Sequence, residues 1–143
     1  MSDTKTPAQA GANPTGERRI PAPMINPESK PFWQAAAQGR LLLGRCLACR
    51  QPHFYPRAIC PHCFSDDTTH VDAAGGGEIY SVSVMRRGVP APYALAYVAL
   101  DEGVTMLTNI VDCDFDALRI GQRVRLVFKP AEDGSQVPVF TPA

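Results

Sequence analysis

Long apolar runs are absent from this sequence of 143 residues, which limits the classes of protein it can encode. A membrane-spanning helix needs roughly 20 consecutive apolar residues, and no stretch approaches that length, so no membrane segment is expected. The first residues, MSDTKTPAQAGANPTGERRIPAP, contain no apolar segment of the kind that a secretory signal requires. We therefore expect a cytoplasmic protein. In a reducing cytoplasm, paired cysteines bind metal or carry out redox chemistry more often than they form disulfides.

Catalytic motifs are also missing. The sequence has no Gly-x-Ser-x-Gly nucleophile motif, no phosphate-binding P-loop and no Rossmann fingerprint. His70 stands alone in the stretch DDTTHVD, and Asp101 and Glu102 precede Gly103, which is the composition of a turn. No nucleophile–base pair is evident, so we do not expect the chain to be an enzyme by itself.

Net charge is zero, but the charges are unevenly distributed. Residues 40–63 contain four arginines and no acid, whereas residues 64–143 contain eleven acids and six bases. A basic segment is therefore followed by an acidic half. This asymmetry bears on the choice of partners, because binding a polyanion needs positive charge along the binding surface.

The 14 prolines and 11 glycines favour short elements, while 45% hydrophobic residues suffice for a packed core. Residues 1–29 lack periodicity, and we expect a flexible N-terminal arm there; an arm that becomes ordered against a partner is the alternative. A helix of about two turns should follow. Ser29 suits its N-cap, Pro31 its first turn and Gly39 its end.

The C-terminal half has the pattern of a small β-barrel. Five runs rich in Val, Ile, Tyr, Leu and Thr are bounded by Gly, Pro or Asp: residues 78–88, 93–100, 104–111, 122–130 and 138–142. Residues 114–121 should form a turn or short helix capped by Asp114 or Asp116, and residues 74–78, AGGGE, should form a sharp bend or a flexible joint before the first strand. Such an arrangement predicts a five-stranded Greek-key barrel of the OB-fold type. The chain should be mainly β, with the helix and a cysteine-rich unit in residues 30–70 and the barrel in residues 71–143.

Four of the five cysteines form two Cys-x-x-Cys pairs, Cys46/Cys49 and Cys60/Cys63. Two intervening residues let both thiolates of a tight turn point at one ion, and the ten residues between the pairs allow a short hairpin to bring the turns together. Its strands should be RLLLGRC and HFYPRAIC. The spacing is that of a zinc ribbon. Four thiolates close the tetrahedral shell of Zn²⁺ and leave no position for water, so the metal should be structural.

Other interpretations of the cysteines stay open. Iron in a rubredoxin-like site takes the same four ligands. A thioredoxin-like redox pair lacks the expected strand–helix context and does not explain two pairs. His53 and His62 are close in sequence, but with four thiolates present we expect them outside the ligand set. Acids flank Cys113 and disfavour its thiolate, so we expect a half-buried structural cysteine and not a nucleophile.

The order of these parts resembles one known family. The stretches that carry the resemblance are FWQAAAQGRLLLGRCLACRQPHFYPRAICPHC, GGGEIYSVSV, YALAYVALDEGVTMLTNIVD, LRIGQRVRLVF and PVFTP. They are similar to the zinc-ribbon plus OB-fold proteins associated with acyl-CoA enzymes, first catalogued as domain of unknown function thirty-five. The resemblance implies a helical N-terminal segment, a rubredoxin-like zinc ribbon and a C-terminal OB-fold.

The resemblance also implies a role. Proteins of this kind are small partner subunits of thiolases, thiolase-like aldolases or related acyl-CoA enzymes. The partner supplies the catalytic residues, while the small subunit stabilises the complex and helps to form the acyl-CoA site. We accordingly expect a thiolase-like partner, a hetero-oligomer, and a coenzyme A thioester bound at a site shared with that partner.

Candidate contacts for CoA or for the partner lie around the cysteines. Arginine holds phosphate in bidentate fashion, so Arg45, Arg50 and Arg57 are candidates; alternatively they are solvated or paired with the partner's acids. Four aromatic residues either line an acyl or pantetheine path or form the core between helix and ribbon: Phe32, Trp33, Phe54 and Tyr55.

The alternative function is a nucleic-acid-binding module, because zinc ribbons and OB-folds often bind nucleic acids. Tyr80, Tyr93 and Tyr97 offer rings for base stacking. The acidic balance of the C-terminal half opposes this function, so nucleic acid is not the expected partner. A stand-alone thioesterase or hydratase has no supporting residues.

Overall fold

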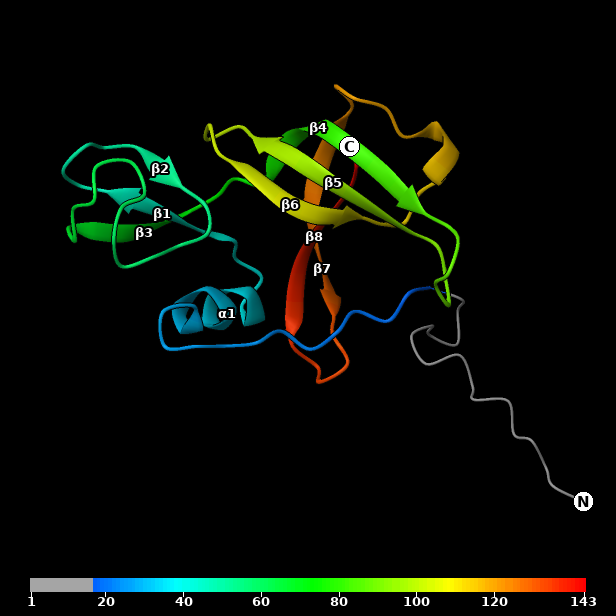
Figure 1. Cartoon of the computed structure of the whole chain (residues 1–143), viewed down its shortest axis with the longest axis horizontal. Coiled ribbons are helices and arrows are strands. Elements are labelled where there is room, and N and C mark those ends of the chain that lie inside the picture. Colours follow the sequence, from blue (N-terminus) through cyan, green and yellow to red (C-terminus); the bar gives the residue numbers. More distant parts are fainter. Residues whose placement is uncertain (1–16) are drawn as a thin grey trace, which may run out of the picture.

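The computed structural model describes residues 17–143, and within this range the chain is mainly β (Figure 1). Helix α1 (Lys30–Ala37) precedes a three-stranded sheet of β1 (Leu42–Cys46), β2 (Pro52–His53) and β3 (Thr68–Asp72). A closed barrel follows, made of β4 (Gly76–Met85), β5 (Tyr93–Leu100), β6 (Thr105–Ile110), β7 (Arg123–Pro130) and β8 (Gln136–Pro142). The predicted fold class is confirmed. Among the described residues, none of the helices has the length and apolarity to cross a membrane.

Helix α1 begins and ends where the sequence predicts. Ser29 is the N-cap and Pro31 lies in the first turn, while Gly39 adopts φ +74° just beyond the helix. The Ser29 hydroxyl does not cap the helix itself. It accepts the Asn26 backbone N–H at 3.0 Å, and the Ser29 N–H donates to the Asn26 side chain at 2.8 Å. The entry turn and the helix are therefore tied together before the first helical residue.

The ribbon sheet differs from the predicted hairpin. β1 lies in the centre, between β2 and β3. Of the expected second strand, residues 53–60, only His53 pairs with β1, next to Pro52, and the proline at 56 removes a backbone donor from the rest of this stretch. The missing pairing is supplied by β3, a strand that the sequence analysis did not predict, and β3 pairs with every residue of β1.

The barrel has the predicted strands, in the order β4-β5-β6-β8-β7. All pairings are antiparallel except that of β6 with β8, which is parallel and rests on one residue pair, Ile110 and Phe140. Buried and exposed residues alternate along β5, as in a strand with one face on a core. The predicted insertion is the 3-10 helix η1 (Phe115–Ala117), where Asp114 accepts the Asp116 N–H.

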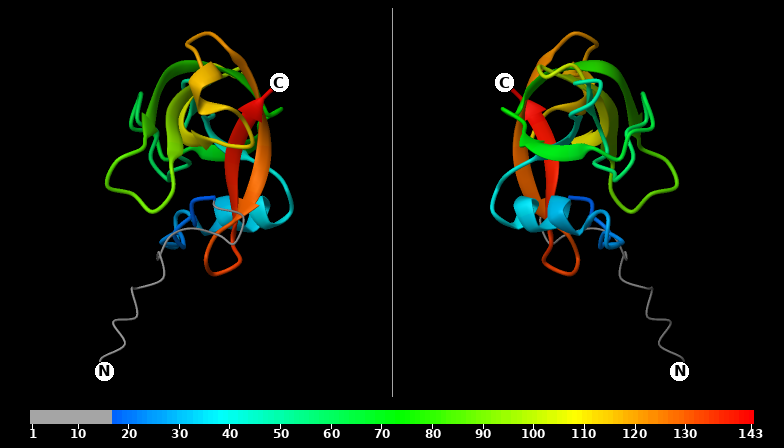
Figure 2. Two further views of the ribbon diagram at one scale, coloured as in Figure 1. Left: turned by 90° about the vertical axis from the view of Figure 1, so that its right-hand side faces the viewer. Right: turned by 90° about the vertical axis from the view of Figure 1, so that its left-hand side faces the viewer.

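One hydrophobic cluster runs through both parts of the molecule. It joins α1 and β1 to the barrel interior and includes Phe32, Leu41, Leu43, Ile79, Val98 and Phe140. Both side views of Figure 2 show α1 at the lower end of the barrel, beside the β7–β8 hairpin. The ribbon is therefore anchored to the barrel through a common core.

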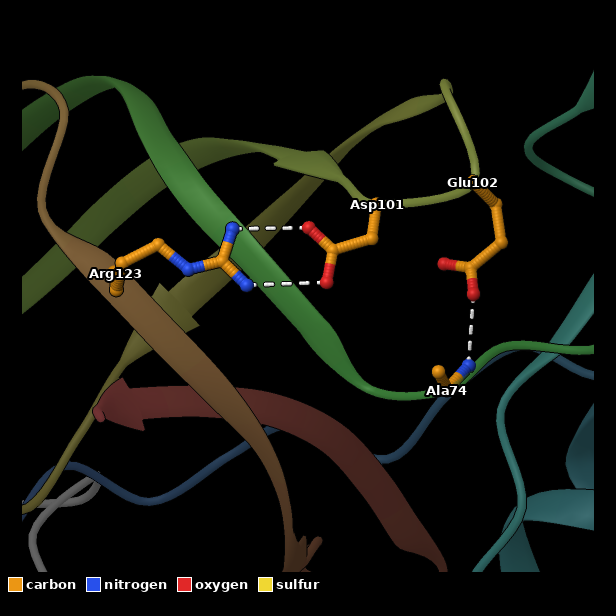
Figure 3. A network of polar contacts seen from close by, with 4 residues as sticks. All are labelled: Ala74, Asp101, Glu102 and Arg123. Carbon is orange, nitrogen blue, oxygen red and sulfur yellow. Dashed lines mark hydrogen bonds and ion pairs between the residues drawn. The ribbon is translucent and has the colours of Figure 1, made fainter.

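Two acids in the β5–β6 turn hold the joint between ribbon and barrel (Figure 3). Asp101 accepts two hydrogen bonds from the Arg123 guanidinium, at 2.9 and 3.0 Å, and these bonds lower the pKa of Asp101. Glu102 accepts the backbone N–H of Ala74 at 2.8 Å, next to the bend at Gly75. Both acids thus serve in a turn, as predicted, and they fix the start of β4.

Residues 17–29 run along the barrel and then to the ribbon. The Glu132 N–H donates to the Ile20 carbonyl at 2.9 Å, and the Arg18 guanidinium lies 4.1 Å from the centre of the Tyr93 ring. Farther along, the Glu28 carboxylate accepts the Ala58 N–H at 2.6 Å. This segment contacts both parts of the fold, whereas residues 1–16 of the expected arm lie outside the described residues.

Gly77 offers a test of how closely β4 approaches β5. A Cβ atom at this position would lie 2.7 Å from the Val98 side chain and 2.8 Å from the Ala99 carbonyl oxygen. Because a backbone oxygen cannot move aside, Gly77→Ala should lower the free energy of unfolding by about 1–3 kcal/mol. Urea denaturation measures the effect, with Ser83→Ala on the exposed side of the same strand as control. Equal midpoints for the two variants would contradict the close approach.

Candidate functional site

The four cysteine sulfur atoms of the ribbon lie within 4.8 Å of one another. The Cys46 and Cys63 sulfurs are 3.6 Å apart, and those of Cys49 and Cys60 are 3.7 Å apart. Zinc–sulfur bonds of about 2.3 Å in a tetrahedron place the sulfurs roughly 3.8 Å from one another. The donor set and its spacing therefore fit one tetrahedral metal ion, as the sequence predicts.

The two cysteine pairs lie in knuckles that share two features, a backbone N–H directed at the first sulfur and a left-handed residue after the second cysteine. In the first, the Cys49 N–H donates to the Cys46 sulfur at 3.4 Å. In the second, the His62 N–H donates to the Cys60 sulfur at 3.3 Å. The residue after the second cysteine, Arg50 in one knuckle and Phe64 in the other, has a φ of +64° in both cases. Backbone donors thus face the sulfurs and stabilise their negative charge.

These hydrogen bonds, together with burial, shift the pKa values of the cysteine thiols. In the thiol form, the Cys49 N–H lowers the pKa of Cys46 to about 7. The Gln51 N–H acts to lower the pKa of Cys49, but burial and the adjacent thiols outweigh it and raise this pKa to about 11. A metal ion that binds all four sulfurs displaces their protons, so metal affinity falls as the pH falls.

The histidines contribute no atom to this ligand group. The His53 ring is 3% exposed and lies where a side chain on Gly44 would be, so glycine is needed at position 44. Burial lowers the pKa of His53, and the ring is neutral at pH 7. The His62 ring lies 3.2 Å from the Pro52 carbonyl oxygen. A tetrahedral ion bound by four cysteine sulfurs has no open coordination position, so a metal held here would be structural.

The aromatic candidates form a single cluster between α1 and the ribbon. Ring centres of Phe32 and Tyr55 are 4.7 Å apart, and those of Phe32 and Trp33 are 5.0 Å apart. Phe54 contacts both Phe32 and Tyr55 edge-on. Phe32 is 3% exposed, while its three neighbours are half-buried. The structure therefore brings all four residues together, with Phe32 at the buried centre.

The three candidate arginines, Arg45, Arg50 and Arg57, are exposed. None of them makes an ion pair within residues 17–143, where the ion pairs are Arg40–Asp72, Arg86–Asp116, Arg123–Asp101 and Lys129–Asp112. These three charges therefore have no ion-pair partner in the described part of the chain.

A groove of about 420 Å³ runs beside the second knuckle. Among the residues that line it are Glu28, Tyr55, Arg57, Ile59 and Phe64. The sequence analysis did not select Ile59 or Phe64, because a single apolar residue in a polar loop has no periodic signal. Phe64 is 77% exposed, so the groove has a large apolar side chain at its edge.

A larger cavity, of about 560 Å³, lies at the barrel between β5, β6 and the segment around Arg18. Cys113 lines it and is half-buried. Burial, with a contribution from Asp114 and Asp112, raises the pKa of Cys113, so the thiol stays protonated at pH 7. The prediction of a structural, non-nucleophilic cysteine agrees with this environment.

The outward face of β4, β5 and β6 carries almost no charge. On β5 and β6 the outward positions are Leu95, Tyr97, Ala99, Thr105, Leu107 and Asn109. Tyr80 and Tyr97 are exposed on this face, whereas the Tyr93 ring is half-buried under Arg18. In OB-folds this is the side on which nucleic acids bind, and here it lacks the basic residues that such binding needs.

Two family profiles match the chain. Residues 33–69 match "ChsH2, rubredoxin-like zinc ribbon domain" and residues 70–129 match "ChsH2, C-terminal OB-fold domain". A "DUF35 domain-containing scaffold protein" of Methanothermobacter thermautotrophicus is 35% identical over 76% of this chain and 87% of its own length. The chain belongs to the ChsH2/DUF35 family. The resemblance identified from the sequence is confirmed, and so is the zinc ribbon with its four cysteines.

Other members of the ChsH2/DUF35 family carry more specific names. A chain of the "Ltp2-ChsH2(DUF35) aldolase" is 38% identical, with a TM-score of 0.75, over 85% of this chain and 98% of that one. The "Benzoylsuccinyl-CoA thiolase subunit BbsA" of Geobacter metallireducens is 29% identical over 68% of both chains. A "Probable enoyl-CoA hydratase alpha subunit" of Thermomonospora curvata is 39% identical over 86% of this chain, which spans only 40% of that relative.

Removing one ligand tests the metal site. Cys46→Ser should lose most of its metal and unfold the ribbon, because a structural zinc contributes on the order of 10–16 kcal/mol of apparent binding energy. Elemental mass spectrometry of the purified protein gives both the amount of metal and its identity, zinc or iron. Circular dichroism reports the loss of structure.

Cys113→Ser is the matched control, because this thiol lies outside the ligand group. It should retain one metal ion per chain and the thermal stability of the unmodified protein. Full metal content in Cys46→Ser would show that the four-cysteine assignment is wrong.

Proposed function

We propose that this chain is a non-catalytic subunit of an acyl-CoA enzyme complex whose catalytic subunit is thiolase-like, either a thiolase or an aldolase of that type. The observation that carries the proposal is the likeness, along nearly all of its length, to the ChsH2(DUF35) chain of an aldolase. A second relative is named as a subunit of a CoA thiolase, which supports the same role. The described residues offer no nucleophile–base pair of their own, in keeping with a partner that supplies the chemistry.

We propose further that the chain stabilises its partner and contributes to the acyl-CoA site. The names of two relatives contain a CoA thioester, and the ribbon carries unpaired arginines that suit the phosphates of CoA. Arg57 is the strongest candidate, because it shares the ribbon groove with Tyr55. The guanidinium offers paired donors to a phosphate, while the ring offers an apolar surface to the pantetheine arm. Phe32 of α1 packs against Tyr55 and supports this side of the groove.

The hydratase in the name of one relative gives no separate candidate, since this chain spans less than half of that protein. The nucleic-acid alternative is disfavoured by two features of the barrel. Its outward face on β5 and β6 is uncharged, and the C-terminal half has an excess of acids. A polyanion would have no matching positive surface there.

Reconstitution with a thiolase-like protein tests the proposed role. The isolated chain should show no thiolase or aldolase activity. It should form a complex with the Ltp2 subunit of the related aldolase or with a thiolase-like protein that co-purifies from the native host. Size-exclusion chromatography with light scattering measures the complex. Activity of the pure chain, or the absence of any thiolase-like partner, would overturn the proposal.

The role of Arg57 is tested in that complex. Arg57→Ala should raise the KM for the acyl-CoA roughly tenfold, because one charge-assisted hydrogen-bonding partner of a phosphate is lost. Arg119→Ala, an exposed arginine on the barrel, should leave KM unchanged. Equal KM values for the two variants would remove Arg57 from the CoA site without affecting the subunit role.

A further inference from the structure

The two metal knuckles share an unusual backbone feature. Arg50 and Phe64 directly follow the second cysteine of their pairs, and both have a φ of +64°. In this left-handed conformation the Cβ of an ordinary residue crowds the backbone, and glycine is the residue that adopts it without a steric cost. A bulky side chain such as phenylalanine is an outlier there. Both knuckles therefore carry large side chains at the positions where glycine would be most favourable.

Neither side chain compensates for this strain inside the chain. Phe64 is 77% exposed, lies outside the hydrophobic cluster and makes no ring contact with the aromatic residues of the ribbon. Arg50 is exposed and makes no ion pair within residues 17–143. Large side chains at strained positions, without contacts in the described part of the chain, point to a function outside the molecule.

The knuckles hold the backbone of these two residues in a fixed conformation. The Phe64 N–H donates to the Cys60 carbonyl at 2.9 Å, and each of the two residues is bonded to a metal-ligating cysteine. A backbone that is already ordered adds no ordering cost of its own on association. Arginine and aromatic residues are also the types enriched at the energetic centres of protein interfaces.

We propose that Phe64 and Arg50 are the anchors by which the metal knuckles dock onto the thiolase-like subunit. This inference rests on the proposed function and deepens it. The Phe64 ring enters an apolar pocket on the partner, and the Arg50 guanidinium pairs with a partner carboxylate beside that pocket. Charge complementarity favours a partner with an acidic surface, because Arg45, Arg50 and Arg57 are exposed and make no ion pair within residues 17–143.

A second copy of this chain fits the anchors less well. The outward face of β5 and β6 is uncharged, so it offers no carboxylate to Arg50. The barrel cavity is lined by the bases Arg18, Arg86 and Lys129 as well as by acids, and Lys129 already pairs with Asp112. Neither surface combines an apolar pocket with a carboxylate free of nearby bases, so the anchors fit a different protein better.

Glycine substitutions separate docking from folding. Phe64→Gly and Arg50→Gly remove the side chains and relieve the left-handed strain, so the metal content and the thermal midpoint of the free chain should stay the same or rise. Affinity for the partner subunit should fall at least tenfold for Phe64→Gly and severalfold for Arg50→Gly. Stability and binding then change in opposite directions, which a purely structural role would not produce. Leu107→Ala and Arg119→Gly are the matched controls on the barrel and should bind as the unmodified chain does.

The experiment is titration calorimetry of the full chain with the Ltp2 subunit, or with the thiolase-like protein recovered from the native host. Unchanged affinity of both glycine variants would overturn the docking role while the proposed function stands. Failure of the unmodified chain to bind either protein would overturn the proposed function, and the docking role with it. Loss of self-association, or loss of acyl-CoA binding at unchanged partner affinity, would assign the anchors to a second copy or to the ligand and would also overturn the inference.

Discussion

Coordination of one metal ion by four thiolates is the constraint on which the ribbon depends. The ribbon sheet has strands of two and five residues, and a sheet of this size does not bury enough surface to fold alone. The metal joins the end of β1 to a loop that contains three prolines and almost no regular structure. Because β1 also contributes Leu42 and Leu43 to the common core, order at the metal extends into the barrel.

The metal site and most of the barrel were predictable because their signals are local. Two Cys-x-x-Cys pairs define a ligand set without reference to the rest of the chain. The five barrel strands are continuous runs of β-forming residues bounded by turn residues, and the helix has a proline in its first turn and a glycine just beyond its end. The short helix expected in residues 114–121 was predictable for the same reason. Asp114 caps η1 by accepting the N–H of Asp116, which is only two positions away.

What the sequence did not reveal depends on contacts between distant residues. β3 is short and mostly exposed, and only its pairing with β1 makes it a strand. The expected second strand ended at His53 because prolines interrupt the backbone donors that a ladder needs. The left-handed conformation of Arg50 and Phe64 arises from closure of the knuckles. It could not be predicted from the residue types, because neither arginine nor phenylalanine favours a positive φ. Likewise, the bonds of Asp101 to Arg123 join positions more than twenty residues apart.

The contacts between ribbon and barrel limit how the ribbon of one family member can be joined to the barrel of another. Gly76 begins β4, and a Cβ there would lie 2.4 Å from the Asp101 carboxylate that pairs with Arg123. The bend at Gly75, the β5–β6 turn and the start of β7 thus form one interlocked unit, although they are far apart in sequence. A chimera that joins this ribbon to a foreign barrel must transplant these three segments together. The boundary between the ribbon and the barrel is therefore a packed contact between three chain segments. It is not a single linker at which the chain can be divided.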